Sequence, residues 1–384
     1  MTSSQPYRLR LPGPTPVPEQ VRQAISQPVV NHRGPEFRAM YEQVQRLAKP
    51  IFGTESQIIA LACSGTGAME AALVNVLCPG ERVLVAINGQ FSERFAAIAR
   101  ALGAEVDVIE VPWGRAVDAA DIENRVSKTH YRAVVVVHNE SSTAITTPLE
   151  PIGALLRDRE TIFVVDSVSG LAGTEIRQDE WGADIVVTAS QKALMCPPGA
   201  ALVSISEKAR KLIALELRFP RFYFDFRKAL ASSEKFETPF TAPVTLVAGL
   251  KAALEMIHTE GLPAVLKRHG RLSSALRAGC VAIGLPAFGD RAAQSATVVA
   301  VEVPQNLNGA DIVRLLYERH RTVIAGARNN RLTGKIIRFG TMGHIHEADI
   351  LTDLEHLEDV LAALGHSFRR GNGVAAADAM LQNS

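Results

Sequence analysis

The chain has 384 residues, of which 47% are hydrophobic and 21% are charged, and its 41 Lys and Arg side chains nearly balance its 40 Asp and Glu side chains. The length suggests two domains, and the apolar fraction argues against disorder over most of the chain. The near-zero net charge argues against a general binder of nucleic acid or of membrane surfaces.

The remaining compositional features predict a cytoplasmic protein without a membrane or metal partner. No stretch approaches the roughly 18 apolar residues of a membrane span, and residues 1–16 lack the apolar core of a secretory signal. Because the four cysteines are widely spaced and form no CxxC pair, we expect reduced thiols rather than disulfides or a zinc framework. They are Cys63, Cys78, Cys196 and Cys280.

The first part of the chain predicts an extended arm followed by a helix. Four of the ten residues at 11–20 are prolines, and this density is incompatible with a helix. We therefore expect an N-terminal arm over residues 1–15. From about Pro35 onward, apolar residues recur at helical spacing and predict a helix.

Between Ile58 and Ile205, short apolar runs alternate with amphipathic stretches of helical length. Most runs are rich in Val and Ile and apolar on both faces, as strands covered by helices on both sides are. The alternation predicts a mostly parallel α/β sheet, in which ligands bind beyond the carboxyl ends of the strands. One intervening helix is predicted at 91–102, ending before Gly103. The predicted strands are 83–87, 106–111, 133–138, 161–166, 184–189 and 201–205.

The alternation ends after about Lys208, and the C-terminal part follows an α+β pattern. The aromatic and charged residues 219–240 are expected to form a loop or interface segment. Helices are then predicted at 243–260, after Gly261 and from Glu347, with strands at 296–303 and 335–339. The organisation predicted from these elements is an arm (1–15), a large domain (16–260) and a small domain (261–384).

Two ionisable residues follow predicted strands of the large domain. Lys192, in the sequence Ser190-Gln191-Lys192, comes directly after the run 184–189, where apolar neighbours would lower its pKa as a Schiff-base lysine requires. Asp166 ends the run 161–166 and must be paired or solvated. Taken alone, Lys192 also fits a solvated loop. Asp166 also fits a turn cap, or the partner of a metal, a ribose or a protonated ring nitrogen.

Further polar residues suggest an anion site. Ser64, Gly65 and Thr66 begin an amphipathic helix, where free N–H groups and the helix dipole suit a phosphate, although an ordinary Ser64 N-cap explains them as well. The segment 138–143, HNESST, either lines a site or forms a polar loop. Arg338 can bind a carboxylate in a bidentate pair or form a surface ion pair.

With these residues placed, the sequence resembles the class V aminotransferases of pyridoxal phosphate fold type I, above all the alanine–glyoxylate and serine–glyoxylate (serine–pyruvate) aminotransferases. The resemblance covers nearly the whole chain. It implies a large domain with a mostly parallel, seven-stranded type of sheet between helices, and a smaller α+β C-terminal domain. The shared stretches are PGPTPVP, SGTGAMEAALVNVL, HNESST, DSVSGLAGTEI, ADIVVTASQKAL with CPPG, and GKIIRFGTMG.

The resemblance implies pyridoxal 5′-phosphate as cofactor and assigns roles around its ring. Lys192 would hold the cofactor as a Schiff base and move the substrate proton, and Asp166 would pair with the ring nitrogen so that the ring acts as an electron sink. Val168 would pack on one ring face. Phe91 would stack on the other face, where relatives often carry the larger Trp.

The resemblance also implies the remaining contacts of the site. Arg338 would bind the substrate α-carboxylate, and Gly13 would close the site beside it. Thr241 would reach the phosphate from the partner subunit of a homodimer, whereas Thr238 stands where some relatives have tyrosine. The other implied cofactor contacts are Ser64, Gly65, Thr66, Ser141 and Gln191.

The implied reaction is transamination between serine or alanine and glyoxylate or pyruvate. Pyridoxamine, aspartate or ureidoglycine are alternative donors on the same scaffold, and the segment 31–37, NHRGPEF, favours the serine–glyoxylate group. A lyase or desulfurase would need a nucleophilic cysteine on a mobile loop, whereas Cys280 has the pattern of a helical core residue. A non-catalytic binding protein is disfavoured by the presence of Lys192, Asp166 and Arg338.

Overall fold

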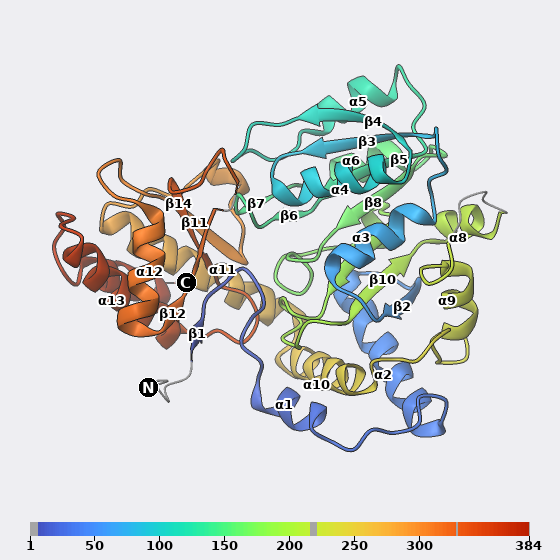
Figure 1. The fold of residues 1–384 in the computed structure, drawn as a ribbon, viewed down its shortest axis with the longest axis horizontal. Coiled ribbons are helices and arrows are strands. Elements are labelled where there is room, and N and C mark those ends of the chain that lie inside the picture. The colour runs from blue at the N-terminus through green and yellow to red at the C-terminus, as the bar shows by residue number, and fades with distance from the viewer. Residues whose placement is uncertain (1–6, 216–220, 328, 384) are drawn as a thin grey trace.

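A computed structural model describes residues 7–215, 221–327 and 329–383, and its centre is a seven-stranded sheet (Figure 1). The four contacts that join β9, β8, β5, β3 and β4 are parallel, whereas β10 runs antiparallel to both of its neighbours. In spatial order the strands are β2 (Gln57–Leu61), β10 (Ala201–Ile205), β9 (Ile185–Ala189), β8 (Ile162–Asp166), β5 (Ala133–Val137), β3 (Arg82–Ile87) and β4 (Glu105–Glu110).

Helices cover both faces of this sheet, as the apolar runs predicted. Successive residues of a strand point to opposite faces, so that Val164 packs into one buried cluster and Val165 into the other. One face is covered by α1 (Glu19–Ile25), α2 (Pro35–Phe52), α5 (Ala119–Val126), α6 (Glu150–Leu156) and α10 (Val244–Glu260). The other is covered by α3 (Gly65–Val74), α4 (Gln90–Ala101), α8 (Glu207–Ala214) and α9 (Phe226–Ser233).

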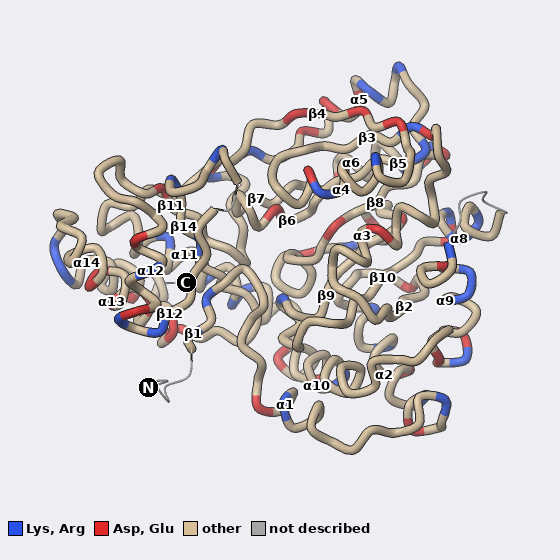
Figure 2. The backbone as a smooth tube through the Cα atoms, in the orientation of Figure 1, with Lys and Arg blue, Asp and Glu red and all other residues tan. Residues whose placement is uncertain are grey.

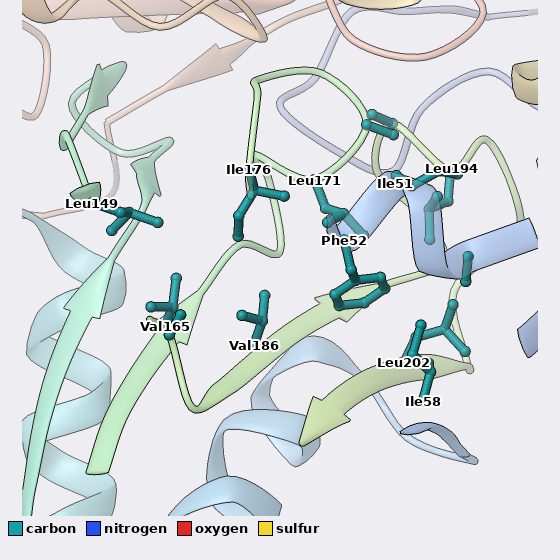
Figure 3. Close-up of a cluster of buried hydrophobic side chains, with 14 of the residues drawn as sticks. Ile51, Phe52, Ile58, Leu149, Val165, Leu171, Ile176, Val186, Leu194 and Leu202 are labelled. Atoms are coloured by element: carbon teal, nitrogen blue, oxygen red, sulfur yellow. The ribbon is translucent and has the colours of Figure 1, made fainter. Parts of the chain in front are cut away.

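Figure 3 shows the first of these clusters, in which Phe52 of α2 lies over Val186 and Leu202 of adjacent strands. All three side chains are almost completely buried. Burial of this kind contributes about 1.5–3 kcal/mol for each large apolar side chain. The sheet therefore provides a rigid base for the loops at its edge.

The C-terminal part has its own three-stranded sheet and its own buried apolar cluster. The strands run antiparallel in the order β11 (Val298–Glu302), β14 (Ile336–Gly340) and β13 (Ala325–Gly326). Its helices are α11 (Leu262–Ala282), α12 (Gly309–His320), α13 (Glu347–Ala363) and α14 (Asn372–Gln382). Two short strand pairs lie outside these sheets: β1 (Arg8–Leu9) with β12 (Thr322–Val323), and β6 (Asn139–Glu140) with β7 (Ile145–Thr146). The remaining short elements are α7 (Gln178–Trp181) and a 3₁₀ turn (Arg291–Ala293).

Two predictions of local structure need correction. The proline-rich segment does not stay extended to its end, because α1 begins at Glu19, directly after Pro18. Residues 226–233, predicted as loop, form α9, because the Asp225 side chain caps the helix and Phe226 is buried against the sheet. Residues 219 and 220 of that predicted loop lie outside the described part of the chain.

Charged residues of both signs are interspersed along the chain (Figure 2). This matches the balanced composition. Within the described residues, no helix combines the length and the apolar character that a membrane crossing requires.

Candidate active site

Asp166 and Lys192 lie at the carboxyl ends of the neighbouring strands β8 and β9, and both are buried. Burial raises the pKa of Asp166 to about 7, against the effect of the Val168 backbone N–H, which donates to its Oδ1 at 2.7 Å. Burial also lowers the pKa of Lys192 to about 8, and the Asp166 charge opposes this shift. The two groups therefore interact electrostatically inside the protein.

The N-terminal arm covers the Lys192 side chain. The Nζ atom donates a hydrogen bond to the carbonyl oxygen of Pro12, and the Thr15 hydroxyl donates to the Lys192 carbonyl oxygen at 2.9 Å. Gly13 has a φ of +100°, and a Cβ there would lie 2.5 Å from Cδ of Lys192. Only glycine fits this position, because both the backbone conformation and the space exclude a side chain.

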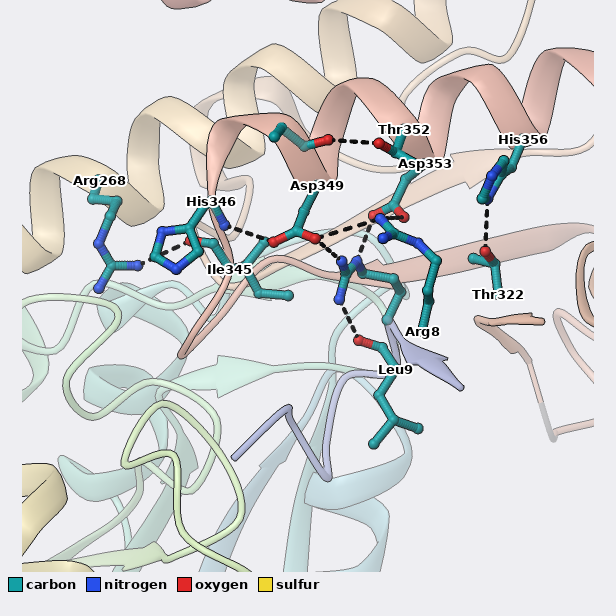
Figure 4. A network of polar contacts seen from close by, with 12 residues as sticks. Arg8, Leu9, Arg268, Thr322, Ile345, His346, Asp349, Thr352, Asp353 and His356 are labelled. Atoms are coloured by element: carbon teal, nitrogen blue, oxygen red, sulfur yellow. Dashed lines mark hydrogen bonds and ion pairs between the residues drawn. The ribbon is translucent and has the colours of Figure 1, made fainter. Parts of the chain in front are cut away.

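The arm is in turn anchored on the C-terminal part of the chain (Figure 4). Strand β1 pairs with β12, and the buried Arg10 donates from Nε to Oδ2 of Asp353 on α13 at 2.7 Å. Arg10 also forms an ion pair with Asp349, one turn earlier on the same helix. We call Arg8, Arg10, Asp349 and Asp353 the arm network.

The start of α3 lies next to the Asp166 loop. Ser64 is the N-cap of α3, and its hydroxyl accepts from the Gly67 N–H at 3.4 Å. A Cβ on Gly65 would lie 3.1 Å from Cγ2 of Val168, so that glycine permits this close approach. The Thr66 hydroxyl accepts a hydrogen bond from Nη1 of Arg94 on α4 at 2.9 Å. Sequence reasoning missed Arg94, although it lies close to Phe91 on the same predicted helix.

Phe91 faces Lys192 from the start of α4, with 6.0 Å between its ring centroid and Nζ. Its backbone is held by Glu140, a fully buried carboxylate that accepts from the N–H groups of Phe91 at 3.1 Å and Ser92 at 3.0 Å. Burial raises the pKa of Glu140. Sequence reasoning also missed this residue, although it stands beside Ser141 in the HNESST segment.

Arg338 joins the small sheet to this group of residues. The guanidinium is buried and donates from Nη1 to the Ser141 carbonyl oxygen at 2.7 Å, and from Nη2 to the Gly326 carbonyl oxygen at 2.8 Å. Arg338 lies on β14, opposite Ala325 in the register of the sheet. The structure thus brings the predicted carboxylate-binding arginine next to the predicted cofactor residue Ser141.

Two predicted phosphate contacts differ in their surroundings. The side-chain oxygen of Gln191 is buried and has no hydrogen-bond partner among the described residues. Thr241 is exposed and borders a small hollow together with Ala62, Tyr223 and Phe240, and Lys192 does not line this hollow. The Thr238 hydroxyl donates to the Phe240 carbonyl oxygen at 2.7 Å. Within one chain, Thr241 is therefore not gathered with the other predicted residues.

The candidate nucleophiles of the alternative reactions are poorly suited to them. Cys280 is fully buried in α11, and burial raises the pKa of its thiol to about 12. Burial raises the pKa of Cys196 to about 12 as well. Because the thiolate is the reactive form, neither cysteine is activated for attack. In the described ranges, no group of three His, Cys, Asp or Glu side chains is arranged to hold a metal ion.

Together these residues fit a flat, phosphorylated heterocycle with an aldehyde group. The fit rests on a buried lysine of lowered pKa, a buried carboxyl group, an aromatic ring facing the lysine and a helix N-terminus with close backbone approach at Gly65.

Comparisons with known proteins agree with this geometry. The family model of the class V aminotransferases matches residues 10–350. The chain is 38% identical over 98% of both chains to a protein of Synechococcus sp. strain PCC 6716 named soluble hydrogenase, small subunit. It is 36% identical to an L-aspartate–glyoxylate aminotransferase of Paracoccus denitrificans and 34% identical to a serine–glyoxylate aminotransferase of Arabidopsis thaliana, in both cases over 98% of this chain and 96% of the relative.

A solved structure supports the same conclusion. The crystal structure of ureidoglycine–glyoxylate aminotransferase from Bacillus subtilis superposes with a TM-score of 0.94 at 29% identity, over 100% of both chains. The expected fold, with its mostly parallel sheet between helices, is therefore confirmed. The chain belongs to the class V aminotransferase family and is a pyridoxal phosphate-dependent transaminase of fold type I.

Proposed function

We propose that the chain transfers an amino group from serine or alanine to glyoxylate or pyruvate. The relatives named as serine–glyoxylate and aspartate–glyoxylate aminotransferases support glyoxylate as the acceptor. Aspartate is the second candidate donor, because the Paracoccus denitrificans relative named for it is 36% identical over 98% of this chain. Pyridoxamine and ureidoglycine remain as further donors for experiment to separate.

The observation that carries this proposal is that Lys192 and Asp166 are both buried at neighbouring strand ends and interact electrostatically. Bound pyridoxal phosphate supplies an aldehyde that links to an amine and a ring that withdraws electrons from the neighbouring carbon. Lys192 would hold that aldehyde carbon. A pKa of about 8 leaves roughly a tenth of Lys192 neutral at pH 7, far more than for an ordinary lysine, and both carbonyl attack and proton removal require the neutral amine. Lys192 would then move the proton from the substrate α-carbon.

Asp166 would hold the ring nitrogen in its protonated form. Burial raises its carboxyl pKa to about 7 even though Lys192 and Arg94 lower it, and a protonated nitrogen would favour its ionised form further. Val168 and Phe91 would lie against opposite ring faces. Ser64, Gly65, Thr66 and Gln191 would hold the phosphate, and Ser141 would lie beside the ring.

Arg338 would bind the substrate α-carboxylate. Its guanidinium is already oriented by the carbonyl oxygens of Ser141 and Gly326, so that binding a carboxylate needs little ordering. Gly13 lets the arm pass close to the Lys192 side chain, where that carboxylate would lie. The arm would thereby close the site around a small substrate.

The proposal includes a homodimer in which each subunit completes the other's site. Phe222 is 69% exposed, and Tyr223 stacks on Phe240 with ring centroids 5.2 Å apart, close to Thr241. An exposed aromatic group of this kind is typical of an interface. Thr241 would contact the partner's phosphate.

The domain division at residues 15 and 260, and a cytoplasmic location, remain part of the same proposal.

A panel of donors tests the function. Serine, alanine, aspartate, pyridoxamine and ureidoglycine would each be mixed with the holoenzyme, and the change in cofactor absorbance would be followed without an acceptor. Glyoxylate and pyruvate would then be compared as acceptors. We expect serine or alanine to convert the cofactor fastest. Absence of conversion by both of them would contradict the proposed donor, and conversion by aspartate alone would establish the second candidate.

A further inference from the structure

The proposed phosphate contacts of the cofactor leave a charge unbalanced. A phosphate monoester carries about −1.5 to −2 at neutral pH, whereas a helix N-terminus supplies only about +0.5. The side chains and backbone groups assigned to the phosphate are all neutral. They belong to Ser64, Gly65, Thr66, Gln191 and Thr241.

Arg94 is the cation that lies beside this group. Its Nη1 donates to the Thr66 hydroxyl at 2.9 Å, and its guanidinium carbon lies 4.8 Å from the centroid of the Phe91 ring. Although burial dominates the pKa values of Asp166 and Lys192, the Arg94 charge lowers both. The guanidinium therefore lies within electrostatic reach of the site residues.

Arg94 acts on Asp166 through space but has no carboxylate in direct contact among the described residues. In the described part of the chain it forms no ion pair with a carboxylate, and the adjacent Glu93 is directed to Arg331, at 3.6 Å. Thr66 stands in the first turn of α3, so that Arg94 approaches the positive end of a helix. Two positive groups at this spacing repel, and an anion bound between them would remove the repulsion.

We infer that Arg94 provides the positive charge of the phosphate subsite and is a cofactor-binding residue of this enzyme. The inference rests on the proposed assignment of Ser64, Gly65 and Thr66 to the phosphate. Through its position over the Phe91 ring, the same guanidinium also supports the aromatic face of the site. Its main contribution is nevertheless specific to the phosphate and absent for the unphosphorylated aldehyde.

Binding to the apoenzyme separates these two contributions. We would measure the dissociation constants of pyridoxal phosphate and of pyridoxal for wild type and for Arg94→Gln. We expect the variant to bind pyridoxal phosphate about 10- to 100-fold more weakly, as the loss of a charge-assisted contact implies, and to bind pyridoxal about as wild type does. Arg100→Gln, at an exposed position of the same helix, is the matched control and should change neither constant.

Two outcomes would overturn the inference. Equal weakening of both ligands would mean that Arg94 only supports Phe91, and unchanged binding of pyridoxal phosphate would mean that it does not reach the phosphate. If Arg94→Gln does not fold, Arg94→Lys provides the test, because it keeps the charge and should bind more tightly than the charge-free Arg94→Met. Failure of wild-type apoenzyme to bind pyridoxal phosphate would instead contradict the cofactor site itself.

Inorganic phosphate gives an independent readout. It should compete with pyridoxal phosphate for wild-type apoenzyme and compete more weakly for Arg94→Gln. Equal competition in the two proteins would contradict the assignment of Arg94 to the phosphate, whatever the activity of the loaded enzyme.

Discussion

Two segments that carry predicted site residues are held by arginine–carboxylate clusters, and the clusters differ in burial. The arm that presents Gly13 is held by the arm network, in which the side chains of Arg10 and Asp353 are only 5% and 1% exposed. The segment that presents Thr241 is held through Glu237, which pairs with Arg33 and Arg38, whose side chains are 44% and 48% exposed.

Because of this difference, we expect the arm with Gly13 to be held firmly within one chain and the segment with Thr241 to be held less firmly. Breaking a buried pair leaves an uncompensated charge and is strongly destabilising, whereas an exposed pair contributes little in water. The arm is therefore fixed over Lys192 by its own chain. The arginines that hold segment 237–241 within its own chain are partly exposed, and we expect the partner subunit of the proposed dimer to fix the segment further.

The largest effect is expected at the residue that the arm covers. In Lys192→Ala, turnover should fall by roughly 10²- to 10⁴-fold or more, because both the link to the cofactor and the proton carrier are removed. The absorbance of the lysine-bound cofactor should disappear as well. Lys211→Ala, at an exposed position of α8, is the control. An unchanged spectrum in Lys192→Ala would exclude this lysine as the attachment site.

The next effect tests the arm network directly. In Asp353→Ala, the buried Arg10 loses the more buried of its two carboxylate partners and keeps Asp349, so the free energy of unfolding should fall by about 3 kcal/mol. Burial raises the pKa of Asp353 to about 6, so the comparison belongs at pH 8, where the pair is charged. Chemical denaturation gives the measurement. If Asp353→Ala lowered the free energy of unfolding no more than Asp349→Ala, whose side chain is 24% exposed, burial would not determine how much each carboxylate contributes.

A smaller, pH-dependent effect is expected at Asp166 in the apoenzyme. Its folded pKa of about 7 lies above the ordinary value of 3.8, so its contribution to stability is fully present below pH 3.8 and is lost as the pH rises through 7. Asp166→Asn should remove this pH-dependent loss of stability, because the amide side chain does not ionise. The variant apoenzyme should therefore melt higher than wild type at pH 8, with the difference shrinking at pH 5, while its transamination falls. A pH-independent difference in melting temperature would contradict the raised pKa.

The smallest effect is expected at the exposed cluster. Because the two arginine partners of Glu237 are 44% and 48% exposed, Glu237→Gln should change the melting temperature of the isolated subunit only slightly. In the assembled enzyme it should weaken cofactor binding severalfold by loosening the Thr241 segment. Glu255→Gln, which loses an exposed pair with Lys251 on α10, serves as the control. If Glu237→Gln lost as much stability as Asp353→Ala, the Glu237 cluster would not be weaker than the arm network.

The sequence was most informative where burial and periodicity act together. The strands that end at Asp166 and Ala189 are apolar on both faces, so their positions and the strand-end placement of the site residues could be predicted. The short helices were not, because α1 and α9 depend on tertiary contacts such as the burial of Val21 and Phe226.

Within the site, residues with familiar roles were easier to predict than residues that act through other residues. Glu140 resembles any polar loop residue in the sequence, and only the fold places it under the backbone of Phe91. Arg94 resembles any arginine of an amphipathic helix until the start of α3 is placed beside it. The sequence does not contain these long-range contacts in any local pattern.

The anchoring of the arm has a consequence for the order of folding. The Arg10–Asp353 bond joins residues 343 positions apart, and the Lys192–Pro12 bond spans 180 positions. Contacts of such separation form late, because the long loops between them must close first. During synthesis the strand-end lysine can emerge and reach its place on the sheet before α13 exists. We therefore expect the Lys192 amine to stay uncovered until α13 docks, so that the cofactor can reach it before the arm closes over it.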